Sequence, residues 1–518
     1  MNTNGKLLWV DDEIEMLRAQ ILFLESKGYQ VLKATNGTQA IEMCTHQNFD
    51  LVLLDENMPG LSGLDTLQII KSTQPTLPIV MVTKSEEEDI MNQAIGSQIA
   101  DYLIKPVNPH QILLALKKNI HRKEIVSEVT QSSYRQAFAE IGMQINDSLS
   151  YQDWINVYKQ LVYWELQLSE VGSEMRETLS IQKQEANNTF AKYIRKNYEG
   201  WIDGSIEPPM LSPDLFKKRV FPLLDKGERV FLLIIDNFRY DQWRAIQSEM
   251  SQLFTFDEEL YFSILPTVTQ YARNSLCAGL MPLQIQKLYP DLWVDEDEDE
   301  GKNLNEYALI RTQMQRFKRK ESVAYRKLND SVAVDKLLSQ FNNLLNNELN
   351  VLVINFIDIL SHAKNEHQLV HELVGNEAAL RSITLSWFQH SSVRYLFREI
   401  ARSGYRLLIT TDHGSVQVWN PVRIIGDRQT NTNLRYKIGR NLGYKAKDVY
   451  ELRNPQRVQL PSPNLSSVYA IAYGDRFFAY PNNYNYYASY YRGSFQHGGV
   501  SMEEMIVPLI TLKSKATF

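Results

Sequence analysis

The sequence has few cysteines and no long hydrophobic run. Its 518 residues include only Cys44 and Cys277, too few for a disulfide framework and typical of a reducing compartment. No apolar stretch reaches the roughly 20 residues that a membrane-spanning helix needs. Residues 1–10 also lack the apolar core of a signal peptide and lead into three acidic residues. We therefore expect a cytoplasmic protein with no direct membrane insertion.

A surplus of positive charge is missing as well. The formal net charge is −6, which argues against a surface that coats a nucleic-acid backbone. No helix-turn-helix pattern or basic recognition helix stands out, so a transcription factor that contacts DNA directly ranks last among the hypotheses. With 44% hydrophobic and 22% charged residues the composition is that of an ordinary globular protein, and the length suits two or three domains.

Residues 1–122 alternate between strand and helix patterns. Strands are predicted at 6–10, 30–34, 50–54, 77–82 and 101–104, with helical patterns between and after them. Five such units predict an α/β domain with a doubly wound, flavodoxin-like parallel sheet. Ligand groups collect at the carboxyl ends of the strands in such sheets.

The predicted strand ends carry a consistent set of polar residues: Asp11, Asp12, Asp55, Thr83 and Lys105. Three carboxylates in one crevice suit a hard cation such as Mg²⁺. Asp55 is then placed as a nucleophile toward a phosphoryl donor. Lys105 can pair with the added phosphate, and Thr83 can turn its hydroxyl to it. One such residue is better interpreted as a helix cap, but five in this order favour a site.

These residues lie in three motifs: Val-Asp-Asp-Glu at 10–13, Asp-Glu-Asn-Met-Pro-Gly at 55–60 and Asp-Tyr-Leu-Ile-Lys-Pro at 101–106. With Thr83, they resemble the receiver domain of two-component response regulators. The resemblance implies that a sensor histidine kinase phosphorylates Asp55 and shifts a pre-existing equilibrium. It also implies that Asp12, Asp55 and the backbone carbonyl of Asn57 hold Mg²⁺, with Asp11 behind them. Tyr102 takes the position of the aromatic switch residue.

Residues 123–210 are predicted to form a helical connector. The segment is poor in glycine, and apolar residues recur at helical spacing between Trp154 and Leu168. We expect a small antiparallel bundle, broken near 148–152 and 170–173, that relays a signal or sets the geometry of a dimer. Its aromatic residues could stack on nucleotides, but a helix–helix core is the simpler interpretation. Three prolines mark 200–214 as a linker.

Residues 215–518 are predicted to form a second α/β domain. Buried strands are expected at 229–236, 351–358 and 406–411, each ending in or beside an acidic residue, and a glycine-rich turn follows later. Together they supply six candidate ligands: Asp236, Asp358, His362, Asp412, His413 and His497. Six nitrogen and oxygen ligands suffice for two zinc ions, each with an open position.

A hydroxyl nucleophile should come from a loop near these ligands. The loop after the strand-like stretch 261–265 supplies Thr267 and Thr269. Asn237, beside the first aspartate, is a candidate for binding a substrate phosphate. Arg273 is another candidate, although an outward-facing salt bridge is its simpler interpretation.

The same segment carries five motifs: Ile-Ile-Asp-Asn at 234–237, Leu-Pro-Thr-Val-Thr at 265–269, Asp-x-x-x-His at 358–362, Thr-Asp-His-Gly at 411–414 and His-Gly-Gly-Val-Ser-x-Glu-Glu-Met-Ile-Val-Pro at 497–508. They resemble the alkaline phosphatase superfamily and, within it, the PglZ-type domain. The resemblance implies that one zinc is bound by Asp358, His362 and His497. It implies that the other is bound by Asp236, Asp412, His413 and a threonine.

The resemblance also bears on the reaction. Thr269 best matches the nucleophile of the nucleotide pyrophosphatase/phosphodiesterase branch, and Thr267 is the fallback. Cleavage of a phosphodiester, in a nucleotide or oligonucleotide, through a covalent phosphothreonine is therefore implied.

Three further features have plain structural interpretations. His367 and His371 are four residues apart on a predicted helix, more often a solvated face than a metal site. The acidic stretch 295–300 is expected to be a surface loop. The basic stretch 311–327 could line a groove for a nucleotide substrate, but a solvated helix explains it equally well.

The complete layout resembles PorX-type regulators associated with type IX secretion. That resemblance implies a regulator that acts with a sensor kinase, and with a sigma factor or secretion-motor protein. Our leading hypothesis is a zinc-dependent phosphodiesterase that phosphorylation of Asp55 switches, with a phosphorylation-dependent homodimer. The alternative is a non-catalytic binding module that dimerises on phosphorylation and presents a surface to its partner.

Overall fold

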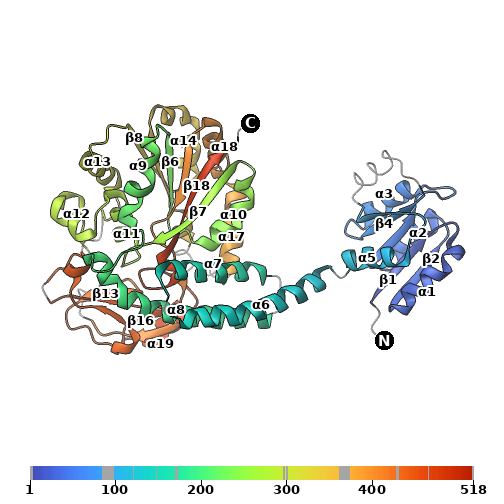
Figure 1. Ribbon diagram of the computed structural model, residues 1–518, viewed down its shortest axis with the longest axis horizontal. Coiled ribbons are helices and arrows are strands. Elements are labelled where there is room, and N and C mark those ends of the chain that lie inside the picture. Colours follow the sequence, from blue (N-terminus) through green and yellow to red (C-terminus); the bar gives the residue numbers. More distant parts are fainter. Residues whose placement is uncertain are drawn as a thin grey trace. The chain divides into compact units, whose positions relative to one another are not determined.

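The computed structural model describes residues 4–84, 99–120, 122–147, 149–169, 173–295, 298, 301–360, 374–426, 431–464 and 466–515 (Figure 1). His362, His367, His371 and most of the acidic stretch 295–300 lie outside the described residues. The chain divides into two compact units, Met1–Ser133 and Tyr134–Phe518. Among the described helices, none has the length and hydropathy to span a bilayer.

The first unit contains a five-stranded parallel sheet in the order β2-β1-β3-β4-β5. Its strands are β1 (Gly5–Val10), β2 (Tyr29–Ala34), β3 (Leu51–Asp55), β4 (Ile79–Thr83) and β5 (Asp101–Ile104). Its helices are α1 (Arg18–Ser26), α2 (Gly37–His46), α3 (Gly63–Thr73) and α5 (Pro109–Ile120). Successive residues of β1 enter two different apolar clusters, because neighbouring side chains on a strand point to opposite faces. The predicted flavodoxin-like fold is therefore confirmed.

Three long helices follow: α6 (Arg122–Asn146), α7 (Tyr151–Gln167) and α8 (Ser173–Asp203). Ser150 starts α7 with a capping box, in which its side chain and that of Asp153 each accept a hydrogen bond from the other's backbone amide. Trp154 of α7 packs on Phe190 of α8 with ring centroids 5.3 Å apart, and Phe190 stacks on Phe262 at 6.2 Å. The apolar faces of α7 and α8 thus join the core of the second unit.

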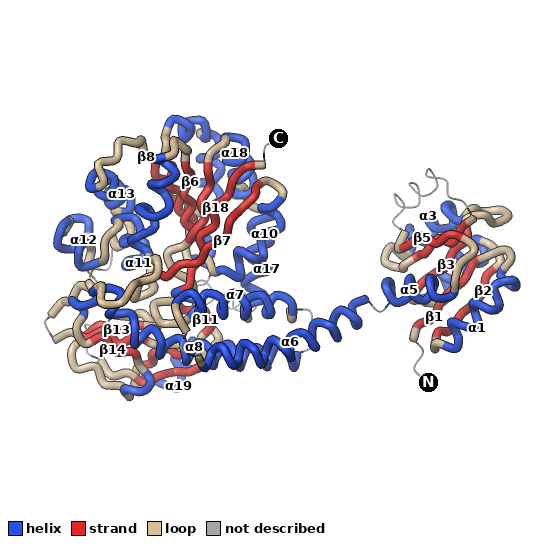
Figure 2. The backbone as a smooth tube through the Cα atoms, viewed as in Figure 1, coloured by secondary structure: helices blue, strands red, loops and turns tan. Residues whose placement is uncertain are grey.

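The second unit is built on a six-stranded sheet in the order β7-β18-β10-β6-β9-β8 (Figure 2). Its strands are β6 (Val230–Ile235), β7 (Phe254–Phe262), β8 (Val323–Leu328), β9 (Leu349–Ile354), β10 (Arg406–Thr410) and β18 (Ile506–Ser514). β18 runs antiparallel to both of its neighbours, and β10, β6, β9 and β8 are parallel. Helices α10 (Tyr240–Ser251) and α17 (Glu377–His390) cover one face, and α11 (Thr269–Ala278) and α13 (Glu306–Arg316) cover the other (Figure 1).

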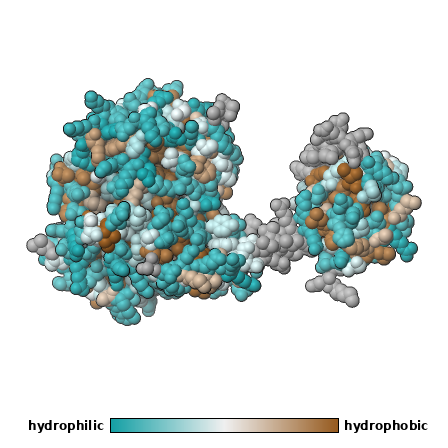
Figure 3. All heavy atoms as spheres, in the orientation of Figure 1, coloured by the Kyte–Doolittle hydropathy of each residue, from teal (hydrophilic) through white to brown (hydrophobic). Residues whose placement is uncertain are grey.

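Shorter elements complete this unit around the sheet. The remaining helices are α9 (Phe221–Asp225), α12 (Pro282–Leu288), α14 (Ser331–Ser339), α18 (Val393–Ser403), α19 (Tyr484–Tyr491) and α20 (Met502–Met505). The remaining strands are β11 (Val416–Gln417), β12 (Asn420–Arg423), β13 (Tyr436–Gly439), β14 (Tyr450–Leu452), β15 (Val468–Ile471), β16 (Arg476–Ala479) and β17 (Phe495–Gln496). The face of the unit in Figure 3 is mainly hydrophilic, as expected for a protein whose apolar residues fill its core.

Two expectations about this unit are wrong. The strand predicted at 351–358 ends at Ile354, and Asp358 lies in a helical turn, in which the amide of Ile359 donates to the carbonyl of Asn355 at 3.1 Å. The apolar run continues from the strand into this turn, so hydrophobicity alone could not locate the boundary. The basic stretch 311–327 is not one helix, because α13 ends at Arg316 and β8 begins at Val323.

Candidate phosphoacceptor and metal sites

The first site lies at the carboxyl ends of β1 and β3. Asp11, Asp12 and Asp55 each place a carboxylate oxygen within 4.8 Å of the others. Asp11 and Asp55 are buried and Asp12 is exposed. Lys105 Nζ lies 2.6 Å from Asp11 Oδ2 and 2.9 Å from Asp55 Oδ2. One ammonium group therefore bridges the two buried carboxylates.

The electrostatics of this site favour a second cation. Burial raises the pKa of Asp55, and the hydrogen bond from Lys105 offsets only a part of that shift. Burial alone would lower the pKa of Lys105, but its bonds to the two carboxylates outweigh burial and raise it. Asp55 Oδ1 is buried and has no hydrogen-bond partner among the residues that the structure describes. A buried carboxylate oxygen without a donor fits a hard cation such as Mg²⁺.

The other residues predicted for this site lie around the same sheet edge. Thr83 is the last residue of β4, and its backbone carbonyl accepts the amide of Lys105 at 2.7 Å. Asn57 is exposed, and its backbone amide lowers the pKa of the Asp55 carboxyl. Tyr102 lies on β5 and is partly buried.

The second site lies at the carboxyl ends of β6 and β10, which are neighbours in the sheet. Asp236 follows β6, and Asp412 and His413 follow β10; their ligand atoms all lie within 4.8 Å of one another, and all three residues are buried. His413 Nε2 is 3.8 Å from both Asp236 Oδ1 and Asp412 Oδ2. Its Nδ1 lies 3.1 Å from the carbonyl of Gly414. A ring held in this way directs Nε2 toward the carboxylates.

Arg273 lies against the two carboxylates of this site. Its Nη2 is 2.5 Å from Asp236 Oδ2 and 2.9 Å from Asp412 Oδ2, and the residue is 1% exposed. The expectation of an outward-facing salt bridge is therefore wrong. Thr269 begins α11 and Arg273 follows one turn later, so both side chains lie on the same side of the helix.

One guanidinium does not neutralise this cluster. Burial raises the pKa of Asp236 well above its ordinary value, although the charge of Arg273 lowers it. Asp412 Oδ2 has Arg273 Nη2 at 2.9 Å, but it accepts no well-aligned hydrogen bond from any described residue. Carboxylate oxygens and imidazole nitrogens are the ligands that zinc takes in proteins, so the donors present fit this metal.

The two candidate threonines occupy different places. Thr269 Oγ1 lies 3.2 Å from His413 Nε2 and 3.5 Å from Asp236 Oδ1. Thr267 is fully buried, and its hydroxyl donates to the carbonyl of Gly499 at 2.9 Å and accepts the amide of Gly498 at 3.0 Å. Thr269 therefore faces the metal-ligand cluster, whereas Thr267 is tied to the glycine turn.

The remaining candidate ligands lie beside this cluster. The rings of His413 and His497 stack with centroids 4.3 Å apart. His497 Nε2 is 3.5 Å from Asp358 Oδ1, and Asn237 Nδ2 donates to the same oxygen at 3.4 Å. The structure thus brings five of the six predicted zinc ligands together, and the sixth, His362, lies outside the described residues.

A buried ion pair behind the second site was not foreseen. Arg435 and Glu504 are both fully buried, with Nη2 2.6 Å from Oε2. Glu504 Oε1 also accepts the amide of Gly499, two residues after His497, at 2.8 Å. The motif at 497–508 contains Glu504 and could have drawn attention to it. No sequence pattern links it to Arg435, which is distant in the chain.

Comparisons with known proteins match three successive segments of the chain. Family models match the response regulator receiver domain at residues 7–117, the PorX response regulator linker domain at 124–202 and the BREX system PglZ alkaline phosphatase-like domain at 215–512. The fold and these matches thus define a two-component response regulator with an alkaline phosphatase-like domain. The match to the PglZ domain covers more than half of the chain, and the chain therefore belongs to the PglZ family. Its three matched segments give it the domain composition of the PorX-type response regulators.

Curated relatives match a smaller part of the chain. Transcriptional regulatory protein ResD of Bacillus subtilis (strain 168) is 35% identical over 129 residues, which are 25% of this chain and 51% of ResD. Transcriptional regulatory protein ZraR of Klebsiella oxytoca is 35% identical over 137 residues, 26% of this chain and 31% of ZraR. A solved receiver domain from Clostridium thermocellum is 32% identical, covering 23% of this chain and 98% of its own, with a TM-score of 0.22. The chain spans about half of ResD and a third of ZraR.

Proposed function

We propose that this response regulator is a zinc-dependent phosphodiesterase with Thr269 as its nucleophile, controlled by phosphorylation of Asp55. The placement of Thr269 carries the proposal. Its hydroxyl lies 3.2 Å from His413 Nε2 and 3.5 Å from Asp236 Oδ1, inside a buried cluster whose donors suit zinc.

The proposed metal centre has two parts. Asp236, Asp412, His413 and Thr269 would hold one zinc, and Asp358, His362 and His497 the other. Zinc in these positions supplies positive charge that lowers the pKa of a neighbouring hydroxyl and stabilises charge on phosphate oxygens.

The reaction proceeds on the side chain of Thr269. Its hydroxyl loses a proton and Oγ bonds to phosphorus, while the bond from phosphorus to one ester oxygen breaks and the departing alkoxide takes up a proton. The intermediate keeps the second ester group on phosphorus. Water then attacks phosphorus, the bond from phosphorus to Oγ breaks, a phosphomonoester is released and the threonine hydroxyl is restored. A nucleotide or short oligonucleotide is the proposed substrate.

Two residues expected at the substrate phosphate have different roles in this proposal. Arg273 is engaged with Asp236 and Asp412, so it holds the carboxylates in place and leaves little of its guanidinium for a substrate. Asn237 remains the candidate phosphate ligand, because its side chain reaches Asp358 at the edge of the cluster.

The receiver domain is the proposed control point. Asp12, Asp55 and the carbonyl of Asn57 would hold Mg²⁺, with Asp11 behind them, while a sensor histidine kinase phosphorylates Asp55. The new phosphate on Asp55 would compete with Asp11 for Lys105, which bridges Asp11 and Asp55. Thr83 and Tyr102 would then change their side-chain positions in response to the phosphate.

The proposed setting of this switch is the cytoplasm, in keeping with two free, buried cysteines. The switch would drive formation of a homodimer in a pathway resembling type IX secretion regulation, with a sigma factor or secretion-motor protein as partner.

The test is hydrolysis of a chromogenic phosphodiester by the full-length protein with zinc. Thr269→Val should lower kcat by about 10³-fold or more, because it removes the attacking oxygen. Thr269→Ser should keep measurable activity, and Thr267→Ser is the matched control at the neighbouring threonine. Wild-type activity in Thr269→Val would exclude Thr269 as the nucleophile.

A non-catalytic binding module is the second candidate, and Arg273 favours it. A guanidinium between Asp236 and Asp412 already supplies part of the charge that a metal would provide. A metal-free protein that still dimerises with a phosphate mimic at Asp55, and hydrolyses no diester after zinc is added, would support this alternative.

A further inference from the structure

Helix α20 (Met502–Met505) lies between the linker helix α8 and the loops that follow β10 and β17. Asn187 of α8 holds α20 at two points. Its side-chain oxygen accepts the amide of Met502 at 2.8 Å, and its side-chain nitrogen donates to Glu503 Oε2 at 2.9 Å. Asn187 and Glu503 are both buried. Little water can therefore reach these bonds, and the amide group of Asn187 holds both the backbone and a side chain of α20.

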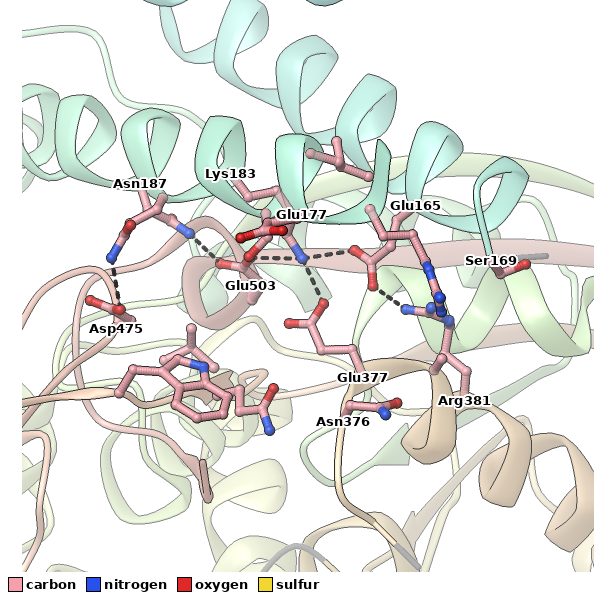
Figure 4. A pocket seen from close by; sticks show the side chains of 18 of the residues that line it. Glu165, Ser169, Glu177, Lys183, Asn187, Asn376, Glu377, Arg381, Asp475 and Glu503 are labelled. Carbon is pink, nitrogen blue, oxygen red and sulfur yellow. Dashed lines mark hydrogen bonds and ion pairs between the residues drawn. The ribbon is translucent and has the colours of Figure 1, made fainter. Parts of the chain in front are cut away.

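Glu503 also belongs to a charge network between the linker helices and the PglZ domain (Figure 4). Lys183, one turn before Asn187 on α8, lies 3.5 Å from Glu503 Oε1 and 2.7 Å from carboxylate oxygens of Glu165 and Glu377. In Figure 4 these carboxylates converge on the lysine from α7, α17 and α20, beside a cavity of about 630 Å³. Two residues of α8 thus hold the same carboxylate of α20.

The opposite side of α20 contacts the two loops that carry the proposed zinc ligands His413 and His497. The carbonyl of Glu504 accepts the amide of Gly414, which follows His413, at 3.1 Å. The carbonyl of Glu503 lies so close that a Cβ on Gly414 would be 2.0 Å from it. The side chain of Glu504 accepts the amide of Gly499 at 2.8 Å. The backbone of α20 is therefore in close contact with the loop at Gly414, and the Glu504 side chain is hydrogen-bonded to the loop at Gly499.

We propose that Asn187 and Lys183 are positioning residues for the metal site. They act through α20 on the backbone that carries His413 and His497, so that the linker helix α8 sets the separation of the two histidines. A displacement of α8 then changes the metal site without touching a ligand. The role of the site rests on the proposed function, but the mechanical coupling does not.

The chain offers a matched control on the same helix. Asn188 accepts a hydrogen bond from Arg476 Nη1 at 3.0 Å, which links α8 to the PglZ domain through a different pair of side chains from those that hold α20. Asn188→Ala therefore removes a neighbouring side-chain bond of α8 and leaves both bonds between Asn187 and α20 intact. Glu503→Gln is a milder second variant, because it keeps a partner for Asn187 and removes the charge that faces Lys183.

The first experiment measures amide hydrogen exchange in the full-length protein, which needs no activity. In Asn187→Ala, the amides of Gly414 and Gly499 should exchange about 10-fold faster than in the wild type, because both are hydrogen-bonded to α20. Glu503→Gln should give a smaller increase, and Asn188→Ala should match the wild type. Unchanged exchange at both glycines in Asn187→Ala and Glu503→Gln, or equal increases in Asn188→Ala, would overturn the proposal.

The second experiment separates this proposal from the proposed function. With the diester substrate and zinc, Asn187→Ala should lower kcat about 10-fold with KM nearly unchanged, because the ligands are misplaced while groups that contact substrate remain. A wild-type protein without Thr269-dependent hydrolysis would refute the proposed function, and the exchange data would still decide the coupling. Faster exchange with an unaltered kcat would overturn the claim that α8 sets the geometry of the metal site.

Discussion

In both sites one basic side chain lies between two carboxylates at the ends of parallel strands. The sites differ in the type of basic residue and in how free its side chain is to move. Lys105 lies in a loop after β5 and is 11% exposed at its side chain, whereas Arg273 lies on α11 and is 1% exposed. A lysine ammonium on a flexible stem can turn to a new partner, whereas a planar guanidinium held by two carboxylates is fixed. The comparison indicates that the receiver site is built to rearrange and the PglZ site to stay in place.

The largest expected effect comes from removing the fixed cation. Arg273→Met should lower the free energy of unfolding of the second unit by about 3–5 kcal/mol, because it leaves Asp236 and Asp412 buried without their partner. Urea denaturation measures the change, and zinc should restore a part of it. Arg273→Lys, which keeps the charge, is the control. A loss of unfolding free energy below about 1 kcal/mol, typical of a surface ion pair, would contradict the claim that Arg273 is a fixed, buried partner of the two carboxylates.

A smaller effect is expected at the receiver site. Lys105→Gln should cost about 1–2 kcal/mol of unfolding free energy without Mg²⁺, because Asp11 and Asp55 then repel each other. Mg²⁺ should recover most of that loss, since the ion takes the place of the ammonium charge. Lys84→Gln is the control, because Lys84 is mostly exposed and its ion pair among the described residues is with the exposed Glu13 at 3.3 Å. A loss that Mg²⁺ leaves unchanged would speak against a shared cation site.

The smallest effect concerns the lysine-centred network of the linker. Burial raises the pKa of Glu377 to about 7, with Glu165 adding to the shift and Lys183 and Arg239 opposing it. A carboxyl with a raised pKa stabilises the fold below its ordinary pKa of 4.5, and that contribution is lost as the pH rises through about 7. The wild type should therefore lose at least about 1 kcal/mol between pH 5 and 8 relative to Glu377→Gln. If the unfolding free energies of the two proteins changed in parallel with pH, the raised pKa of Glu377 would be refuted.

The sequence predicted the bounds of the five receiver strands to within two residues, because β1, β3 and β4 are short apolar runs and turn or helix signals separate all five. It also placed Asp236, Asp412 and His413 together, since adjacent parallel strands end at one sheet edge. The position of Arg273 could not be predicted. A helix period shows which residues share a face, but it does not show whether that face is covered.

The contacts of the linker helices with the PglZ domain could not be predicted from the sequence either. Lys183 and Asn187 look like polar residues on a solvated helix face, and only the fold brings Glu377 and Glu503 to them. Their burial depends on partners about 200 and 300 residues away in the chain, and no local pattern records such partners.

Anomalous diffraction at the zinc edge, from crystals of the full-length protein grown with zinc, tests the central claim most directly. The account predicts one peak among Asp236, Asp412 and His413, within reach of Thr269 Oγ1, and another beside Asp358 and His497. A zinc-loaded crystal without a peak at either place, with Arg273 still bridging Asp236 and Asp412, would contradict it.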